Sequence, residues 1–160
     1  MGLTLTTQMC NTFKKELLFG AHDFAAGSTS VFKIGLFQAE AGPTGTFGQA
    51  TTNYAEVTAA SAELPTAGGY TQPGETLVNI SPTLDTNTAI TDFNDAEWTS
   101  STFTSFGAFI YNSSPDTTII SVTNPMVCIL AFGGDKTSSS GTFQIVFPNR
   151  DATNALIRIA

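Results

Sequence analysis

Charged side chains are scarce in this sequence, at 12% of its 160 residues. Only 6 residues are Lys or Arg, against 13 Asp or Glu, and the basic residues form no cluster. A protein that binds nucleic acid has to neutralise phosphates with grouped cations, so this balance argues against that class. No apolar run approaches the ~20 residues that a membrane-spanning helix requires, so we expect no membrane association.

Cysteine and histidine are also rare, with two Cys and one His. Cys10 and Cys128 lack the CxxC spacing of a metal or redox site. A disulfide between them stays open, although a free Cys128 inside the apolar run 126–130 is the ordinary alternative. His22, beside Asp23, favours a capping or packing role, because no Ser stands in a Gly-x-Ser-x-Gly elbow. We therefore expect no enzyme, no cofactor and no catalytic residue.

Apolar side chains, in contrast, are plentiful. Hydrophobic residues make up 41% of the chain and include 13 Phe, which is enough to form a core and argues against disorder. Ser and Thr together supply about a quarter of the residues, so hydroxyls rather than charges form most of the polar surface. The length suits one domain, since single cores usually span roughly 100–200 residues.

One helix is predicted, at about residues 11–20. Phe13 and Leu17 are four residues apart, and Phe24 follows seven residues later, so the three form an apolar stripe. Asn11 or Thr12 is expected to cap the first turn, and Gly20 or Gly27 to end the helix. The stripe must be buried either against this domain's own sheet or against another subunit. The sequence leaves both possibilities open.

From Val31 onwards the hydrophobic period changes to two, which predicts strands. The clearest alternation is in residues 32–36, and residues 105–112 predict a central strand. Residues 51–57 and 118–122 are also expected as strands, whereas Gly133-Gly134 is expected to make a hairpin turn. Eight to ten short strands in all predict a mainly β fold, an antiparallel β-sandwich or jelly-roll-like single domain with one N-terminal α-helix. We expect residues 1–10 to form an N-terminal arm and residues 11–160 to form this domain.

Two further groups of residues are candidate binding sites. Asp92, Asp95 and Glu97 lie within six residues and could hold a cation such as Ca²⁺. Their spacing does not match an EF-hand loop, which favours a solvated turn capped by Asp95, so no metal site is assigned. Aromatic side chains at strand positions could line a sugar-binding surface or pack at the edge of the core. These residues are Tyr54, Tyr70, Trp98 and Tyr111.

Several stretches are similar to a family of small virion structural proteins of tailed bacteriophages. They are residues 10–18, 22–24, 32–37, 69–71, 92–95, 102–104, 107–114, 132–137, 141–143 and 151–159, with Gly74 and Trp98. The resemblance implies a virion component, assembled in the cytoplasm of a bacterial host. The first residues also lack the basic patch and apolar core of a secretory signal. Two departures are Ser105-Phe106 before Gly107, where the family would have an Arg, and an expanded loop at residues 41–52.

The leading hypothesis is a capsid decoration (cement) protein, which would bind the major capsid protein on the outer surface of the head and also bind itself, as a homotrimer. A small β domain, a sparsely charged surface and the lack of catalytic groups suggest it. The expected contact residues lie in the arm and on the helix stripe: Leu3, Leu5, Phe13, Leu17 and Phe24. The alternative is a receptor- or glycan-binding module of a tail or head fibre.

Overall fold

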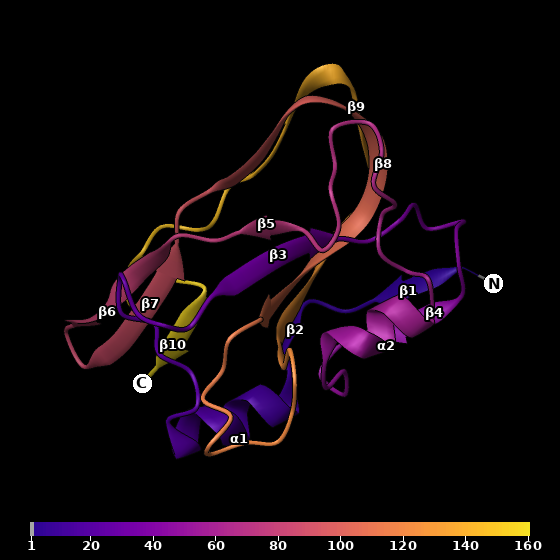
Figure 1. The fold of residues 1–160 in the computed structure, drawn as a ribbon. Coiled ribbons are helices and arrows are strands. Elements are labelled where there is room, and N and C mark those ends of the chain that lie inside the picture. Colours follow the sequence, from indigo (N-terminus) through magenta and orange to yellow (C-terminus); the bar gives the residue numbers. More distant parts are fainter. Residues whose placement is uncertain (1) are drawn as a thin grey trace.

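The alternating residues after Val31 build the centre of the largest sheet. The computed structural model, which describes residues 2–160, arranges five strands there in the order β2-β9-β8-β3-β5 (Figure 1). All neighbouring strands of this sheet run antiparallel. The strands are β2 (Gln8–Met9), β3 (Phe32–Leu36), β5 (Glu75–Thr76), β8 (Ala96–Asn112) and β9 (Met126–Ile145).

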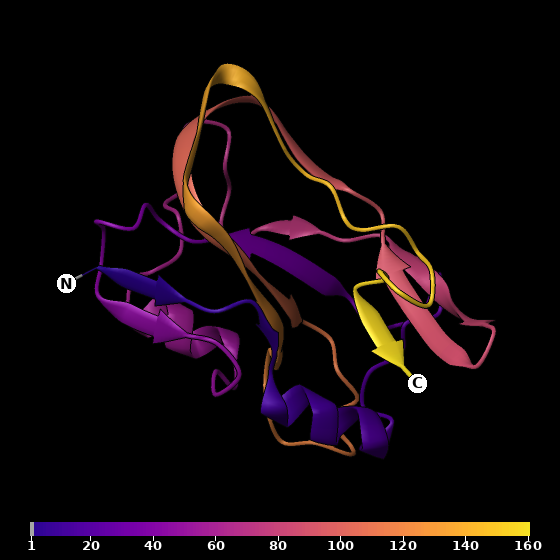
Figure 2. The ribbon, with the colours of Figure 1, turned by 180° about the vertical axis from the view of Figure 1, so that it is seen from behind.

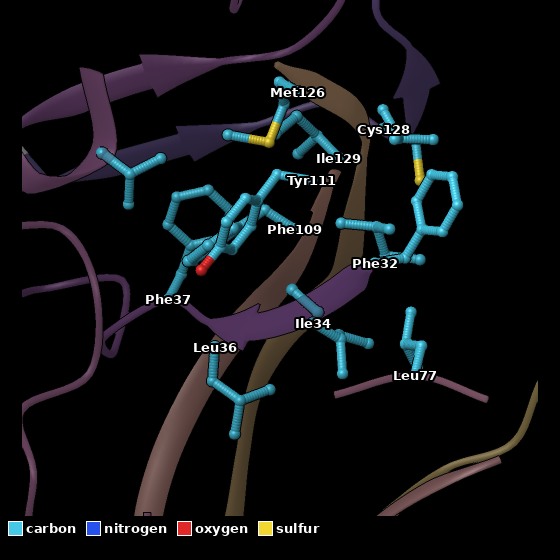
Figure 3. Close-up of a cluster of buried hydrophobic side chains, with 14 of the residues drawn as sticks. Phe32, Ile34, Leu36, Phe37, Leu77, Phe109, Tyr111, Met126, Cys128 and Ile129 are labelled. Carbon is cyan, nitrogen blue, oxygen red and sulfur yellow. The ribbon is translucent and has the colours of Figure 1, made fainter. Parts of the chain in front are cut away.

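Strand β3 contributes three large side chains to the core. Phe32, Ile34 and Leu36 are fully buried, as the period-two pattern predicts. Figure 3 shows them together with buried side chains of β8 and β9, among them Phe109 and Ile129. Because β3 pairs with β8, and β8 with β9, this core joins segments more than 70 residues apart in the chain.

Gly35 lies opposite Phe109 in the β3–β8 ladder, and the aromatic ring occupies the space over the glycine. A Cβ at Gly35 would lie 2.2 Å from Phe109 Cζ, and its three nearest atoms all belong to that ring. A side chain at this position would therefore overpack the core.

We predict that Gly35→Ala lowers the free energy of unfolding by about 1–3 kcal/mol, as overpacking usually does. The same substitution should be at least about 0.5 kcal/mol less damaging in a Phe109→Leu background, because the two positions are coupled. Urea unfolding of the four proteins measures this. Gly141→Ala is the matched control, since the nearest atom to its added Cβ is 3.5 Å away. Equal losses for Gly35→Ala in the two backgrounds would contradict the account.

A second, three-stranded antiparallel sheet packs against the first. It contains β6 (Asn79–Asp85), β7 (Thr88–Phe93) and β10 (Ile157–Ile159) in the order β10-β7-β6. Aromatic rings join the two layers: the ring centroids of Phe93 on β7 and Phe32 on β3 are 5.3 Å apart. Phe24, from the segment between α1 and β3, stacks on Phe32 at 4.5 Å and lies 6.1 Å from Phe93. The expected fold class, a mainly β, sandwich-like antiparallel domain with a short N-terminal helix, is confirmed.

The hairpin of β8 and β9 extends beyond the two layers as an arched ribbon, which both ribbon views show (Figures 1 and 2). The expected turn at Gly133-Gly134 is wrong, because both residues lie inside β9. Gly107 pairs with Ala131 and Ser105 with Lys136, so four residues of β9 face one of β8. Both glycines have positive φ, which permits this bulge.

Two helices are present among the described residues. Helix α1 (Asn11–Phe19) lies where the helix was predicted and ends at Gly20, whose φ of 75° is left-handed. The expected cap by Asn11 or Thr12 is wrong, because Cys10 is the N-cap and no side chain caps the helix. Helix α2 (Tyr54–Ala59) replaces the strand expected at residues 51–57. There the apolar residues Tyr54 and Val57 are three apart, a helical spacing, and Val57 is fully buried. Residues 118–122 are also irregular rather than a strand.

The segment expected as an N-terminal arm, residues 1–10, contributes two short strands to the sheets. Strand β1 (Leu3–Leu5) pairs in parallel with β4 (Gly45–Phe47), and β2 pairs with β9. Leu3 is buried in the core, and Leu5 packs against it. The apolar positions of this segment are therefore covered by its own chain.

The two cysteines are both buried and free, so the disulfide that the sequence left open does not form. Met9 faces Cys128 in the β2–β9 ladder, whereas the Cys10 amide binds the Val127 carbonyl. The Cys10 thiol donates instead to the Gly48 carbonyl, with Sγ 3.6 Å from the oxygen.

Candidate interaction surface

His22, the only histidine, lies in a buried network rather than on an accessible surface. Its Nε2 lies 3.0 Å from Glu16 Oε2 on α1, and its Nδ1 lies 3.0 Å from Asn112 Nδ2 on β8. Asn112 Nδ2 also donates to Ser30 Oγ. Ser30 is bonded to Asn112 and not to His22, so the group does not form a nucleophile–base pair. The network attaches α1 to the central sheet.

Hydrogen bonding defines the tautomer of His22. Asn112 Oδ1 accepts the Ser114 amide, so its Nδ2 is the group that faces His22. His22 Nδ1 must then be an unprotonated acceptor, and Nε2 carries the proton that is donated to Glu16. Burial lowers the pKa of His22 below its usual 6.5, although the adjacent Glu16 carboxylate opposes this shift.

This network predicts a loss of stability on acidification. Because the pKa of His22 is lower in the folded protein, the unfolded chain binds more protons below about pH 6.5. The free energy of unfolding should therefore fall as the pH drops from 6.5 towards the folded-state pKa. Urea unfolding between about pH 5 and 7.5 measures this, with His22→Gln as the control that removes the titration. Parallel pH profiles for the two proteins would contradict the prediction.

Two residues of the acidic cluster, Asp92 and Asp95, accept hydrogen bonds from backbone amides and so stabilise the fold. Asp92 is buried and accepts the amides of Phe93 and Leu156, and Asp95 accepts the amide of Phe147. Burial raises the pKa of Asp92, while those amides oppose the shift. Glu97 is exposed. No group of three metal-binding side chains is found within residues 2–160.

The four aromatic candidates face inwards and do not form a sugar-binding surface. Tyr70, Trp98 and Tyr111 are buried, and Tyr54 is half-buried with its ring stacked on Tyr111 at 4.7 Å. The hydroxyls of Tyr54 and Tyr70 both donate to Glu63, a buried carboxylate. Burial raises the pKa of Glu63. The aromatic rings and Glu63 therefore pack and form hydrogen bonds within the core.

An apolar notch opens between α1 and the three-stranded sheet. This groove of about 180 Å³ is lined almost wholly by apolar side chains of α1, β6, β7 and β10. Its lining residues, which define the apolar notch, are Leu17, Phe24, Pro82, Ala89, Ile90, Thr91, Ile157 and Ile159.

A row of exposed apolar residues continues the notch across the sheet. Leu84 of β6 and Ile159 of β10 both lie directly opposite Ala89 of β7, so the three share one face. Leu84 is 73% exposed and Ile159 is 61% exposed. Phe93 occupies the same face of β7 four residues further on, where the aromatic core covers it. The core thus ends at Ala89, and the rest of this face is open.

The predicted contact residues are mostly covered by their own domain. Leu3, Phe13 and Phe24 are buried, and Leu5 packs against the core. Leu17 alone lines the notch from α1. Whether any of them touches another protein stays a prediction.

Residues outside that prediction provide most of the exposed apolar surface. Leu84 and Ile159 carry the row, and Leu18 and Phe19 of α1 are 90% and 55% exposed. In the sequence they are ordinary members of apolar patterns. They differ from the buried apolar residues only because they lie beyond the edge of the core, and the sequence does not show where that edge falls.

No family model, curated protein or solved structure matches the chain. Among the described residues, no helix is long and apolar enough to cross a membrane.

Proposed function

We propose that this protein is a structural component of a bacteriophage virion, a capsid decoration protein that binds the outside of the head shell and stabilises it. The observation that carries the proposal is the open apolar row of Leu84, Ala89 and Ile159 beside the apolar notch. Large exposed apolar side chains that lie together mark protein–protein contacts.

The edges of the three-stranded sheet add a second means of attachment. β6 and β10 are its outer strands, and the exposed row runs from one to the other. An edge strand can pair with a strand of another protein, which gives backbone hydrogen bonds in addition to apolar burial. A shell subunit that contributes a strand and an apolar side chain would use both features.

The polar groups support a binding role rather than catalysis. His22, Glu16, Glu63 and Asp92 are buried and are used in hydrogen bonds that hold elements of the fold together. The resemblance to small tailed-phage virion proteins agrees with this proposal. The fibre alternative loses its main support, because the aromatic side chains that would bind a glycan lie inside the domain.

A capsid-binding assay tests the proposed surface. Leu84→Glu with Ile159→Glu should weaken binding to shells lacking the protein by at least about tenfold, because a charge would be buried against apolar atoms. Val146→Glu is the matched control, since Val146 is equally exposed but lies in a different groove, with Phe132 and Phe143. Undiminished binding by the double variant would refute this surface.

The copy number of the protein in purified particles tests the decoration role. We expect hundreds of copies per particle, and a few copies would refute that role.

A further inference from the structure

The outward face of α1 combines two cations with two exposed apolar side chains. Lys14 and Leu18 are four residues apart, as are Lys15 and Phe19, so each pair shares one side of the helix. All four are exposed, and Lys15 Nζ lies 5.9 Å from the centre of the Phe19 ring. Glu16, the one acidic residue of α1, is buried. This face is basic at one end and apolar at the other, in a chain of net charge −7.

Carboxylates lie just beyond the C-terminal end of the same helix. Asp23 and Asp116 line one polar groove with Gly20, the residue that ends α1. The loop that carries Asp116 is attached there, because the Asp116 amide donates to the Ala21 carbonyl at 3.0 Å. Figures 1 and 2 show this loop, between β8 and β9, running beside α1. Hydrogen bonds from Thr118 lower the pKa of Asp116.

The order of these groups along α1 is lysines, then exposed apolar residues, then carboxylates. Ile119 is also exposed, on the loop that carries Asp116, and its amide donates to the Asp116 carbonyl. Within residues 2–160 no lysine or arginine lies within salt-bridge distance of a carboxylate, and the His22–Glu16 contact is a hydrogen bond of the neutral imidazole. Lys14, Lys15, Asp23 and Asp116 therefore have no salt-bridge partner there.

Such a surface is complementary to itself. A two-fold axis near Leu18 and Phe19 would place a second α1 antiparallel to the first. The apolar side chains of the two copies would then meet at the centre, and each lysine pair would face the partner's carboxylates. We propose that a second copy of this chain occupies the α1 face, forming a two-fold symmetric dimer through Lys14, Lys15, Leu18, Phe19, Asp23 and Asp116.

This dimer differs in symmetry from the trimer expected from the sequence. It uses residues outside the exposed row of β6 and β10, so it leaves Leu84 and Ile159 free for a shell. The inference goes beyond the proposed function and can fail independently of it, because it concerns the purified protein alone.

Sedimentation velocity of the purified full chain tests the dimer. We expect a species of twice 16.8 kDa, with a dissociation constant that rises with salt concentration. Leu18→Glu with Phe19→Glu should weaken the dimer roughly a hundredfold, as loss of a central apolar contact does. Leu84→Glu and Val146→Glu should leave it unchanged. Unchanged circular dichroism spectra will show that the variants are folded.

The charge pairing is tested by a double-mutant cycle. Lys14→Gln with Lys15→Gln should weaken the dimer roughly tenfold, and Asp23→Asn with Asp116→Asn similarly, because Asn keeps the local turn hydrogen bonds. The lysine changes should add little once the carboxylates are gone. Strictly additive effects would overturn the pairing.

Three results would overturn the dimer itself. One is a wild-type monomer at every concentration up to roughly 100 µM, which would place any affinity below a useful range. Another is a trimer, or a dimer that Leu18→Glu with Phe19→Glu does not affect. The third is a monomer that binds anionic lipid vesicles through α1, which would assign this face to a membrane surface instead.

Discussion

The structure depends on aromatic packing between its two antiparallel sheets. Phe32 on β3 contacts Phe24 and Phe93, and these rings hold the three-stranded sheet against the five-stranded one. Neither sheet would be stable with its apolar face in water, so the position of these rings decides which faces are covered. The rings cover β7 near Phe93 and leave it open near Ala89. The exposed row, on which the proposed function rests, is thus the uncovered end of the same face.

Polar groups provide the second set of constraints. The His22 network links α1 to β8, Glu63 receives two tyrosine hydroxyls, and Asp92 links β7 to the C-terminal segment. Each of these side chains would be expensive to bury without its partners. His22, Glu63 and Asp92 are titratable residues that could suggest a catalytic site, and these hydrogen bonds give each of them a structural role.

Local sequence patterns predicted the parts of the fold that depend on local periodicity. Residues 32–36 alternate and form β3, and α1 ends at the predicted glycine, whose left-handed φ few other residues adopt. The hydrophobic pattern gave wrong predictions in two situations. In one, the spacing of apolar residues fitted both a helix and a strand; in the other, pairing between strands distant in sequence decided the structure. Tyr54 and Val57 fit a short helix as well as a strand, and Gly133-Gly134 can make a bulge as well as a turn.

The candidate surface was harder to predict for a related reason. The stripe of Phe13, Leu17 and Phe24 was correctly identified as needing burial, but a sequence does not show which partner covers it. The domain's own sheets bury Phe13 and Phe24, which leaves Leu18 and Phe19 exposed on the adjacent face of α1. Leu84 and Ile159 are far apart in sequence and become neighbours of Ala89 only through the β6-β7-β10 pairing.

The central claim is that this domain is a binding component of a phage head whose open apolar row contacts the shell. Electron microscopy of the intact particle tests it most directly. We expect the domain to be repeated over the outside of the head, with β6 and β10 turned towards the capsid subunits. Density for the domain at the tail, or on the head with that row facing solvent, would contradict it.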